Sequence, residues 1–419
     1  MFDINKFIKE NSETLKAVYG DRADAMCERI NRSVARFTAL YGAGDAFVFS
    51  VPGRSEICGN HTDHNRGEVF AASIDLDILA VARPTDGGKI RVFSEGFVES
   101  AVDISSLDVK SGDEGTSASL IRGVCDGLIK RGYAVSAFDC YMTSSVLGGS
   151  GLSSSAAFED MIGTIENHFA NGGEIDYMTI AQISQYAENV HFGKPCGLMD
   201  QVACASGGFV HIDFADPSSP VCRAIPFDVG KHGYSLCIIS TGGSHADLTD
   251  DYAAVPAEMK KVASFFEKDV LREVPRERLF ENIAALREYA GDRAILRAIH
   301  FYDENERVRE LERALEADDI NEFLDVVRRS GESSAVLLQN YFSPHAPTEQ
   351  GVTLAAAAAK EFLAGRGAVR VHGGGFAGTV QAFVPKDIVV AFTAGMEKIF
   401  GKGCVTALTV RSIGALKFE

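Results

Sequence analysis

The sequence predicts an α+β protein with two domains, and three observations support this prediction. Short apolar runs typical of strands alternate with longer segments in which apolar residues recur at helical spacing. The chain has 419 residues, enough for two or three domains of roughly 150 residues each. Loop-forming residues gather at 215–230, so we place the domain boundary between residues 1–220 and 221–419.

The pattern of the N-terminal half of the sequence predicts helices followed by strands. Residues 1–45 are expected to be helical, with a turn at Gly20 and Asp21, and a strand begins at Phe47. The stretch 76–94 has two strand-like runs around a turn at 84–88, which predicts a β-hairpin. After Gly148, an apolar stripe predicts a helix, and the serines at its start are expected to cap it. Helices are also predicted at 117–131 and 176–192, and a strand at 137–146.

The second half repeats this mixture of elements. Helices are predicted at 255–268, 277–289, 303–316 and 319–339. Strands are predicted at 233–241, 368–372 and 379–385.

Composition narrows the class of protein. The formal charge of −17, with no long basic run, argues against a nucleic-acid partner. No apolar stretch approaches a membrane span of about 18 residues, and the charged first ten residues do not resemble a signal peptide. Nine cysteines without a CxxC pair favour reduced thiols. We therefore expect a cytoplasmic protein without a membrane or nucleic-acid partner, monomeric or weakly homo-oligomeric.

The segment GGSGLSSSAA (148–157) predicts an anion site. Its glycines allow the backbone to approach a ligand closely, and the following helix presents free N–H groups at its start. Serine hydroxyls add hydrogen bonds to phosphate oxygens and a neutral oxygen ligand for Mg²⁺. The alternative is a glycine-rich turn with a serine cap. GxxxxGK[ST] is absent, so this is not the usual P-loop.

A second glycine-rich segment, HGGGFAG (372–378), matches GxGxxG. A strand follows it where a dinucleotide-binding fold needs a helix, so the Rossmann interpretation fails. A loop packed against another loop or against a bound phosphate remains open.

Polar side chains are dense in residues 54–65, directly after a predicted strand, which indicates a site for a polar ligand. The alternatives are an ordinary surface loop and a transition-metal site at His61, Asp63 and His64.

Together these motifs resemble those of the galactokinases, a family of the GHMP kinase superfamily. PGRSEICGNHTDHNRG (52–67) is similar to the galactokinase signature, and the two glycine-rich segments are similar to the second and third GHMP kinase motifs. Residues 187–201, ending in CGLMDQ, are typical of galactokinases. The resemblance implies the two-domain GHMP kinase fold, with the sugar site and phosphate loop in the N-terminal domain and the active site in the interdomain cleft.

The resemblance also implies roles for individual residues. Asp200 resembles the catalytic carboxylate near the anomeric hydroxyl, and Arg54 resembles its partner, which stabilises negative charge during transfer. Ser155 and Glu188 match the Mg²⁺ ligands, and Tyr252 aligns with a tyrosine that contacts the sugar. The sugar-binding stretch comprises Asn60, His61, Thr62 and Asp63. The loop around the ATP phosphates comprises Gly149, Ser150, Gly151, Leu152, Ser153, Ser154 and Ser155.

The implied activity is transfer of the γ-phosphate of MgATP to the anomeric hydroxyl of galactose, which gives galactose 1-phosphate and ADP. The sequence departs from the family at Asn60, where a glutamate is usual, and at His64, where a tyrosine is usual. A carboxylate at position 60 would repel a 6-carboxylate sugar and an amide would not, so galacturonate is an alternative substrate. Arabinose is another alternative, because a pentose has no C6 for residue 60 to recognise. The chain also has no Trp on which to stack adenine, which leaves purine selectivity open.

Two other classes of function compete with this one. A non-catalytic sugar sensor related to galactokinases is disfavoured because Arg54, Glu188 and Asp200 are all retained. A GHMP kinase acting on mevalonate or homoserine is disfavoured by the CGLMDQ segment and by the His-Thr-Asp triplet at 61–63.

Overall fold

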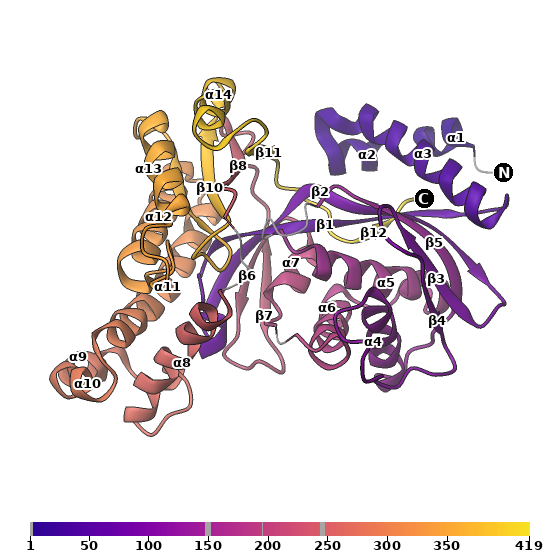
Figure 1. Ribbon diagram of the computed structural model, residues 1–419. Helices are drawn as coiled ribbons and strands as arrows, with labels where there is room; N and C mark the ends of the chain where they lie inside the picture. Colours follow the sequence, from indigo (N-terminus) through magenta and orange to yellow (C-terminus); the bar gives the residue numbers. More distant parts are fainter. Residues whose placement is uncertain (1–2, 147–151, 195, 244–247) are drawn as a thin grey trace.

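The computed structural model describes residues 3–146, 152–194, 196–243 and 248–419 of the chain (Figure 1). Within these residues the strands form two sheets and helices cover them, which confirms the α+β prediction. The first sheet has the order β12-β1-β2-β5-β3-β4, with β6 beside β2 and β7 beside β6. Its strands are β1 (Phe47–Cys58), β2 (Glu68–Thr85), β3 (Lys89–Ser94), β4 (Ser100–Asp103), β5 (Ala137–Ser144), β6 (Phe209–Asp213), β7 (Val221–Ile225) and β12 (Leu416–Lys417).

Helices cover both faces of this sheet (Figure 1). Along β2, Leu79 and Val81 pack with the N-terminal helices, while Ile78 and Ala80 pack with the helices of the opposite face. Alternate residues of a strand point to opposite faces, and because both faces of β2 are covered, its first fifteen residues are all buried. One face carries α1 (Ile4–Glu10), α2 (Ser12–Tyr19), η1 (Gly20–Arg22) and α3 (Ala23–Tyr41). The other carries α4 (Ser117–Lys130), α5 (Ser154–Ala170), α6 (Tyr177–Tyr186), η3 (Ala187–Phe192) and α7 (Met199–Ser206).

The hairpin predicted at 76–94 is wrong. Both strands exist, but β5 lies between them, antiparallel to β2 and parallel to β3. The first six residues of β5 are all buried, as expected for a central strand with both faces covered. The turn residues 84–88 therefore join strands that are neighbours in sequence but not in the sheet.

The second sheet has the order β11-β8-β10-β9. Its strands are β8 (Tyr234–Ser240), β9 (Ala368–His372), β10 (Thr379–Pro385) and β11 (Val405–Leu408). The predicted helix at 277–289 is interrupted at Asn282, and the one predicted from 303 begins eleven residues earlier, at Asp292. The helices of this half are α8 (Thr249–Phe265), η4 (Leu271–Glu273), α9 (Arg276–Glu281), α10 (Ile283–Tyr289), α11 (Asp292–Glu316), α12 (Ile320–Ser333), η5 (Ser334–Leu338), α13 (Gly351–Leu363) and α14 (Val389–Phe400), and η2 (Asp63–Asn65) lies in the first half.

The two halves share an apolar core. Phe70 of β2, Phe323 of α12 and Phe383 of β10 belong to one buried cluster. The chain returns to the first sheet at its end, where β12 pairs with β1. The predicted boundary after residue 220 would divide the β6–β7 hairpin, whereas the chain changes sheets between β7 and β8. The division into domains stays a prediction.

All nine cysteines are free thiols. Among the described residues, no helix combines the length and the apolar composition needed to cross a bilayer.

Candidate active site

Arg54 and Asp200 form an ion pair at the centre of the predicted site. Arg54 lies on β1 beside a register shift with β2, and Asp200 lies in the first turn of α7. Both Nε and Nη2 of Arg54 are 2.7 Å from Oδ1 of Asp200. Burial alone would lower the pKa of Arg54, but the charge of Asp200 raises it above its usual value. The pair joins a buried cation to a carboxylate whose side chain is 32% exposed, so the carboxylate remains accessible to a ligand.

The serine segment packs directly against this pair. The backbone N–H of Arg54 donates to the carbonyl of Leu152. A Cβ atom at Gly53 would lie 2.8 Å from that carbonyl oxygen, so the close approach requires glycine at this position. Gly149, Ser150 and Gly151, which belong to the predicted phosphate loop, lie outside the described residues.

Ser153 connects the start of α5 to the carboxylate. It is in the left-handed region at φ 59°, and its side chain makes no capping hydrogen bond. Its Oγ donates instead to Oδ2 of Asp200 at 2.5 Å. The expectation that the serines cap α5 is therefore wrong for Ser153, the residue at the N-cap position. The two oxygens of Asp200 are held by different elements, Oδ1 by β1 and Oδ2 by the start of α5.

Ser155 and Glu188, the predicted metal ligands, lie side by side. Ser155 Oγ is 3.2 Å from Glu188 Oε1, and Gln201 Nε2 donates to Oε2 at 3.0 Å. Glu188 is buried, and the Nζ of Lys194 neutralises it at 3.0 Å. The residues fit Mg²⁺, because a carboxylate and a hydroxyl are hard oxygen donors. The ammonium group of Lys194 already occupies a cation position beside Glu188.

A second buried carboxylate lies behind Glu188. Gln201 Nε2 also lies 3.2 Å from Glu159 Oε2, so this one amide group spans both acids. Burial raises the pKa of Glu159 well above its usual value. Glu159 and Gln201 were not predicted as supports of this site, although the CGLMDQ segment includes Gln201.

Asn60 and His61 contact the glycine loop that follows β9. The Nδ2 of Asn60 donates to Glu56 Oε1 and to the carbonyl of Gly373, both at 2.9 Å. His61, at φ 59°, donates from Nε2 to the carbonyl of Gly374 at 2.9 Å, and burial lowers its pKa to about 4. HGGGFAG is thus a loop packed against another loop, one of the two possibilities that the sequence left open.

The other residues of the predicted sugar site differ in surroundings. Thr62 is fully buried, and its Oγ1 lies 2.7 Å from the carbonyl of Glu68 within the loop. Asp63 borders the segment before Asp200, because a Cβ at Gly197 would lie 2.4 Å from its Oδ2. Tyr252, on α8, donates to the carbonyl of Gly375 at 3.0 Å.

Several functional neighbours of Asn60 were not predicted. Asn340 Nδ2 donates to Asn60 Oδ1 at 2.7 Å, and His300 Nε2 lies 2.9 Å from the Asn60 carbonyl. Glu56, which accepts from Asn60, also pairs with buried Arg370 at 2.6 Å. No local motif marks Asn340 or His300, because His300 lies on α11 and Asn340 follows η5, both far along the chain. Within the described residues, no group of three His, Cys, Asp or Glu is arranged to hold a metal ion, so the transition-metal alternative at residues 61–64 has no support.

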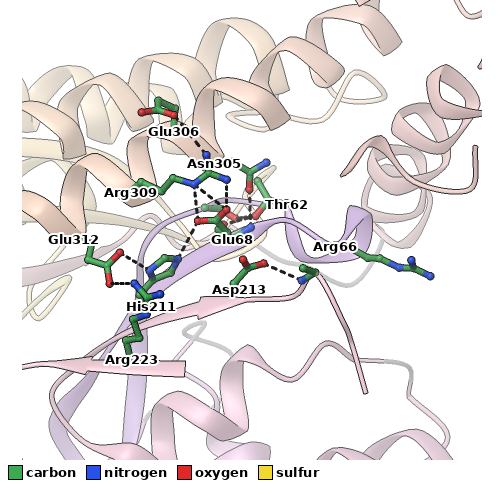
Figure 2. Close-up of polar contacts among 12 residues, drawn as sticks. Thr62, Arg66, Glu68, His211, Asp213, Arg223, Asn305, Glu306, Arg309 and Glu312 are labelled. Atoms are coloured by element: carbon green, nitrogen blue, oxygen red, sulfur yellow. Dashed lines mark hydrogen bonds and ion pairs between the residues drawn. The ribbon is translucent and has the colours of Figure 1, made fainter. Parts of the chain in front are cut away.

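A charged network holds the base of this loop against α11 (Figure 2). His211 of β6 lies between two carboxylates, with Nε2 3.1 Å from Glu68 and Nδ1 2.9 Å from Glu312. Figure 2 shows Arg309 of α11 reaching the same Glu68. Since Glu68 begins β2 and both Arg309 and Glu312 belong to α11, the network ties the first sheet to the helical half.

Comparisons with known proteins agree with this fold and with the family that the motifs resemble. The galactokinase galactose-binding signature matches residues 35–84, and the GHMP kinase N-terminal domain matches residues 119–208. A galactokinase of Streptomyces coelicolor is 31% identical over 367 residues, 87% of this chain and 91% of that protein. One of Enterococcus faecalis is 31% identical over 360 residues, 85% of this chain and 90% of that protein.

Solved structures share the fold. Lactococcus lactis galactokinase, complexed with galactose, superposes with a TM-score of 0.77 at 22% identity, covering 92% of this chain and 99% of that one. Methanococcus jannaschii mevalonate kinase gives 0.63 at 13% identity, covering 88% and 99%. The fold and the paired motifs define a GHMP kinase, a phosphotransferase that uses ATP. Within that superfamily, the chain belongs to the galactokinase family.

Proposed function

We propose that this chain transfers the γ-phosphoryl group of MgATP to the anomeric hydroxyl of galactose, giving galactose 1-phosphate and ADP. The observation that carries the proposal is the bridge from Arg54 through Asp200 to Ser153. It joins β1, which leads into the proposed sugar-binding stretch, to the end of the proposed phosphate loop. Membership of the galactokinase family and the match to the galactose-binding signature support galactose as the acceptor.

Phosphoryl transfer requires positioning and charge stabilisation more than covalent chemistry by the protein. In our proposal the carboxylate of Asp200 orients the anomeric hydroxyl and accepts its proton. The hydroxyl oxygen bonds to the γ-phosphorus as the bond from that phosphorus to the bridging oxygen of ADP breaks. Arg54 holds Asp200 in place and stabilises the negative charge that develops nearby.

Ser155 and Glu188 would hold Mg²⁺. When bound, the ion neutralises charge on the phosphate oxygens and fixes their position. The hydrogen bond from Gln201 to one oxygen of Glu188 leaves the other oxygen directed toward Ser155 and Lys194. This arrangement supports the assignment, because Mg²⁺ usually takes one or two protein ligands and fills its remaining positions with phosphate and water.

The sugar is proposed to contact Tyr252 and the sugar-binding stretch, which comprises Asn60, His61, Thr62 and Asp63. The alternative substrate galacturonate was suggested by the amide of Asn60. Both Nδ2 hydrogens of that amide already have acceptors, Glu56 and Gly373, so neither remains for a sugar carboxylate. This geometry favours the neutral sugar.

We also propose a cytoplasmic enzyme, monomeric or weakly homo-oligomeric. Nine free thiols suit a reducing compartment. ATP is the proposed nucleotide, bound at the start of α5 by backbone amides and the serines of residues 149–155.

One experiment separates the candidate functions. An assay coupled to ADP release is run with galactose, galacturonate, arabinose, glucose and N-acetylgalactosamine, with mevalonate and homoserine as non-sugar acceptors. We expect the highest kcat/KM with galactose. Turnover on galacturonate or arabinose alone would mean that this sugar, and not galactose, is the phosphoryl acceptor. No turnover on any compound would favour a non-catalytic sugar sensor.

A further inference from the structure

Lys194 places an ammonium group inside the proposed site. The residue follows Gly193, whose φ of 81° ends η3, and its backbone N–H donates to the carbonyl of Glu188. This turn folds the side chain back over Glu188, where Nζ lies 3.0 Å from Oε1. The side chain of Lys194 is 63% exposed, whereas that of Glu188 is 3% exposed. An exposed cation therefore covers a buried carboxylate.

The same oxygen of Glu188 serves two partners. Oε1 lies near both Lys194 Nζ and Ser155 Oγ, while Oε2 is occupied by Gln201. Because Ser155 lies in the first turn of α5, the ammonium is at the helix end where the nucleotide phosphates are proposed to bind.

A divalent cation and the ammonium compete for this oxygen. An oxygen that coordinates Mg²⁺ faces a doubly charged ion, and a second cation within hydrogen-bonding distance is repelled. The four-carbon stem of lysine is flexible, and its exposed position leaves room to move. Arg54 lacks this freedom, because two of its nitrogens are bonded to Asp200.

We propose that Lys194 is a phosphate-binding residue that leaves Glu188 when MgATP binds and contacts the phosphoryl group being transferred. The inference rests on the proposed kinase function. In the empty site Lys194 neutralises a buried carboxylate. In the loaded site it adds a positive charge where the transition state spreads negative charge over the phosphoryl oxygens.

The test compares Lys194→Met, Lys194→Arg and wild type, with Lys130→Met as the matched control. Lys130, on α4, is also an exposed lysine paired with a carboxylate, Asp126, at 2.7 Å, and its ammonium contacts Asp126 and Tyr186 instead of Glu188. Three quantities are measured: ATP affinity in EDTA by calorimetry, Mn²⁺ affinity without nucleotide by electron paramagnetic resonance, and steady-state kinetics with MgATP and galactose.

For Lys194→Met we expect ATP affinity in EDTA to fall about tenfold or more, because a charge-assisted hydrogen bond is lost. Mn²⁺ should bind more tightly, because its competitor for Glu188 is gone. In the kinetics, kcat should fall about 10- to 100-fold while the KM for galactose is unchanged. Lys194→Arg should keep most of the ATP affinity, and Lys130→Met should match wild type in all three measurements.

An unchanged or tighter ATP affinity in Lys194→Met would overturn the proposal, and so would an unchanged Mn²⁺ affinity. Both binding measurements are independent of sugar turnover. A wild-type protein that binds ATP but phosphorylates none of the candidate acceptors would therefore reject the proposed function and leave the result on Lys194 standing.

Discussion

The hydroxyl of Ser153 donates a hydrogen bond to the carboxylate of Asp200 across a separation of 47 residues. This contact connects the start of α5 with the first turn of α7. Because Arg54 holds the other oxygen of the same carboxylate, Asp200 cannot rotate without breaking a bond on one side. Ser153, at the start of α5, and the proposed catalytic carboxylate are thus oriented as one unit.

Asp200→Asn should abolish most of the phosphorylation while ATP still binds. An amide cannot accept the hydroxyl proton, and it no longer offers Arg54 a negative charge. We expect kcat to fall about 10²- to 10⁴-fold, measured by ADP release, with ATP affinity measured by calorimetry. Turnover near the wild-type value would reject the catalytic role of this residue.

Ser153→Ala should reduce kcat about 10- to 100-fold, because a hydrogen bond to a charged group is lost and Asp200 gains rotational freedom. The fold should persist, since Ser153 makes no capping bond to α5. Steady-state kinetics and thermal unfolding test these two statements separately. Ser218→Ala, in an exposed turn, is the matched control. Equal kcat values for the two variants would mean that the contact does not orient the carboxylate.

Asn60→Glu should destabilise the protein as well as change its sugar preference. The new carboxylate would face Glu56 and the carbonyl of Gly373 in a buried position, where Asn60 now donates two hydrogen bonds. Removing these donors and burying a second acid should cost about 3 kcal/mol of unfolding free energy. Urea unfolding measures this, with the exposed Asn321→Glu as control. Undiminished stability, together with a higher ratio of galactose to galacturonate turnover, would indicate that position 60 reads the sugar instead.

His211 should make stability depend on pH in a defined direction. Burial alone would lower its pKa, but Glu68 and Glu312 raise it above the usual 6.5. A raised folded-state pKa means that the stabilisation is complete below about pH 6.5 and is lost as the pH rises through the folded-state value. Despite burial, the hydrogen bonds and charges of His211 and Arg309 lower the pKa of Glu68 to about 2. That second contribution is present above about pH 4.5 and is lost as the pH falls toward 2.

The corresponding variant is His211→Gln. At pH 6 it should unfold with about 3 kcal/mol less free energy than wild type, because a buried charge partner is removed. The difference should shrink as the pH is raised from 6 to 9, because the wild-type imidazole loses its proton as the pH rises through its folded-state pKa. Urea unfolding at both pH values measures the two differences. A constant difference across this range would show that His211 contributes packing and no charge.

Some of the site was predictable because its signals are local. The strand that leads to Arg54, the helix that begins at Ser154 and the glycine loop after His372 each follow from short-range periodicity and from the chemistry of glycine and serine. Their likeness to galactokinase motifs also identified Asp200 and Glu188. The contacts of Asn340, His300 and Arg370 with the loop around Asn60 could not be predicted, because each joins residues more than 200 positions apart.

By itself, the sequence determined the α+β class and most of the helices and strands, and it predicted which side chains react. Tertiary structure alone decided which of these groups meet. It inserted β5 between two strands that look like a hairpin, turned Ser153 from a cap into a partner of Asp200, and placed Lys194 on Glu188. The physical reason is that helix and strand periodicity depends on neighbouring residues, whereas strand order and buried polar pairing are chosen by the packing of the whole chain.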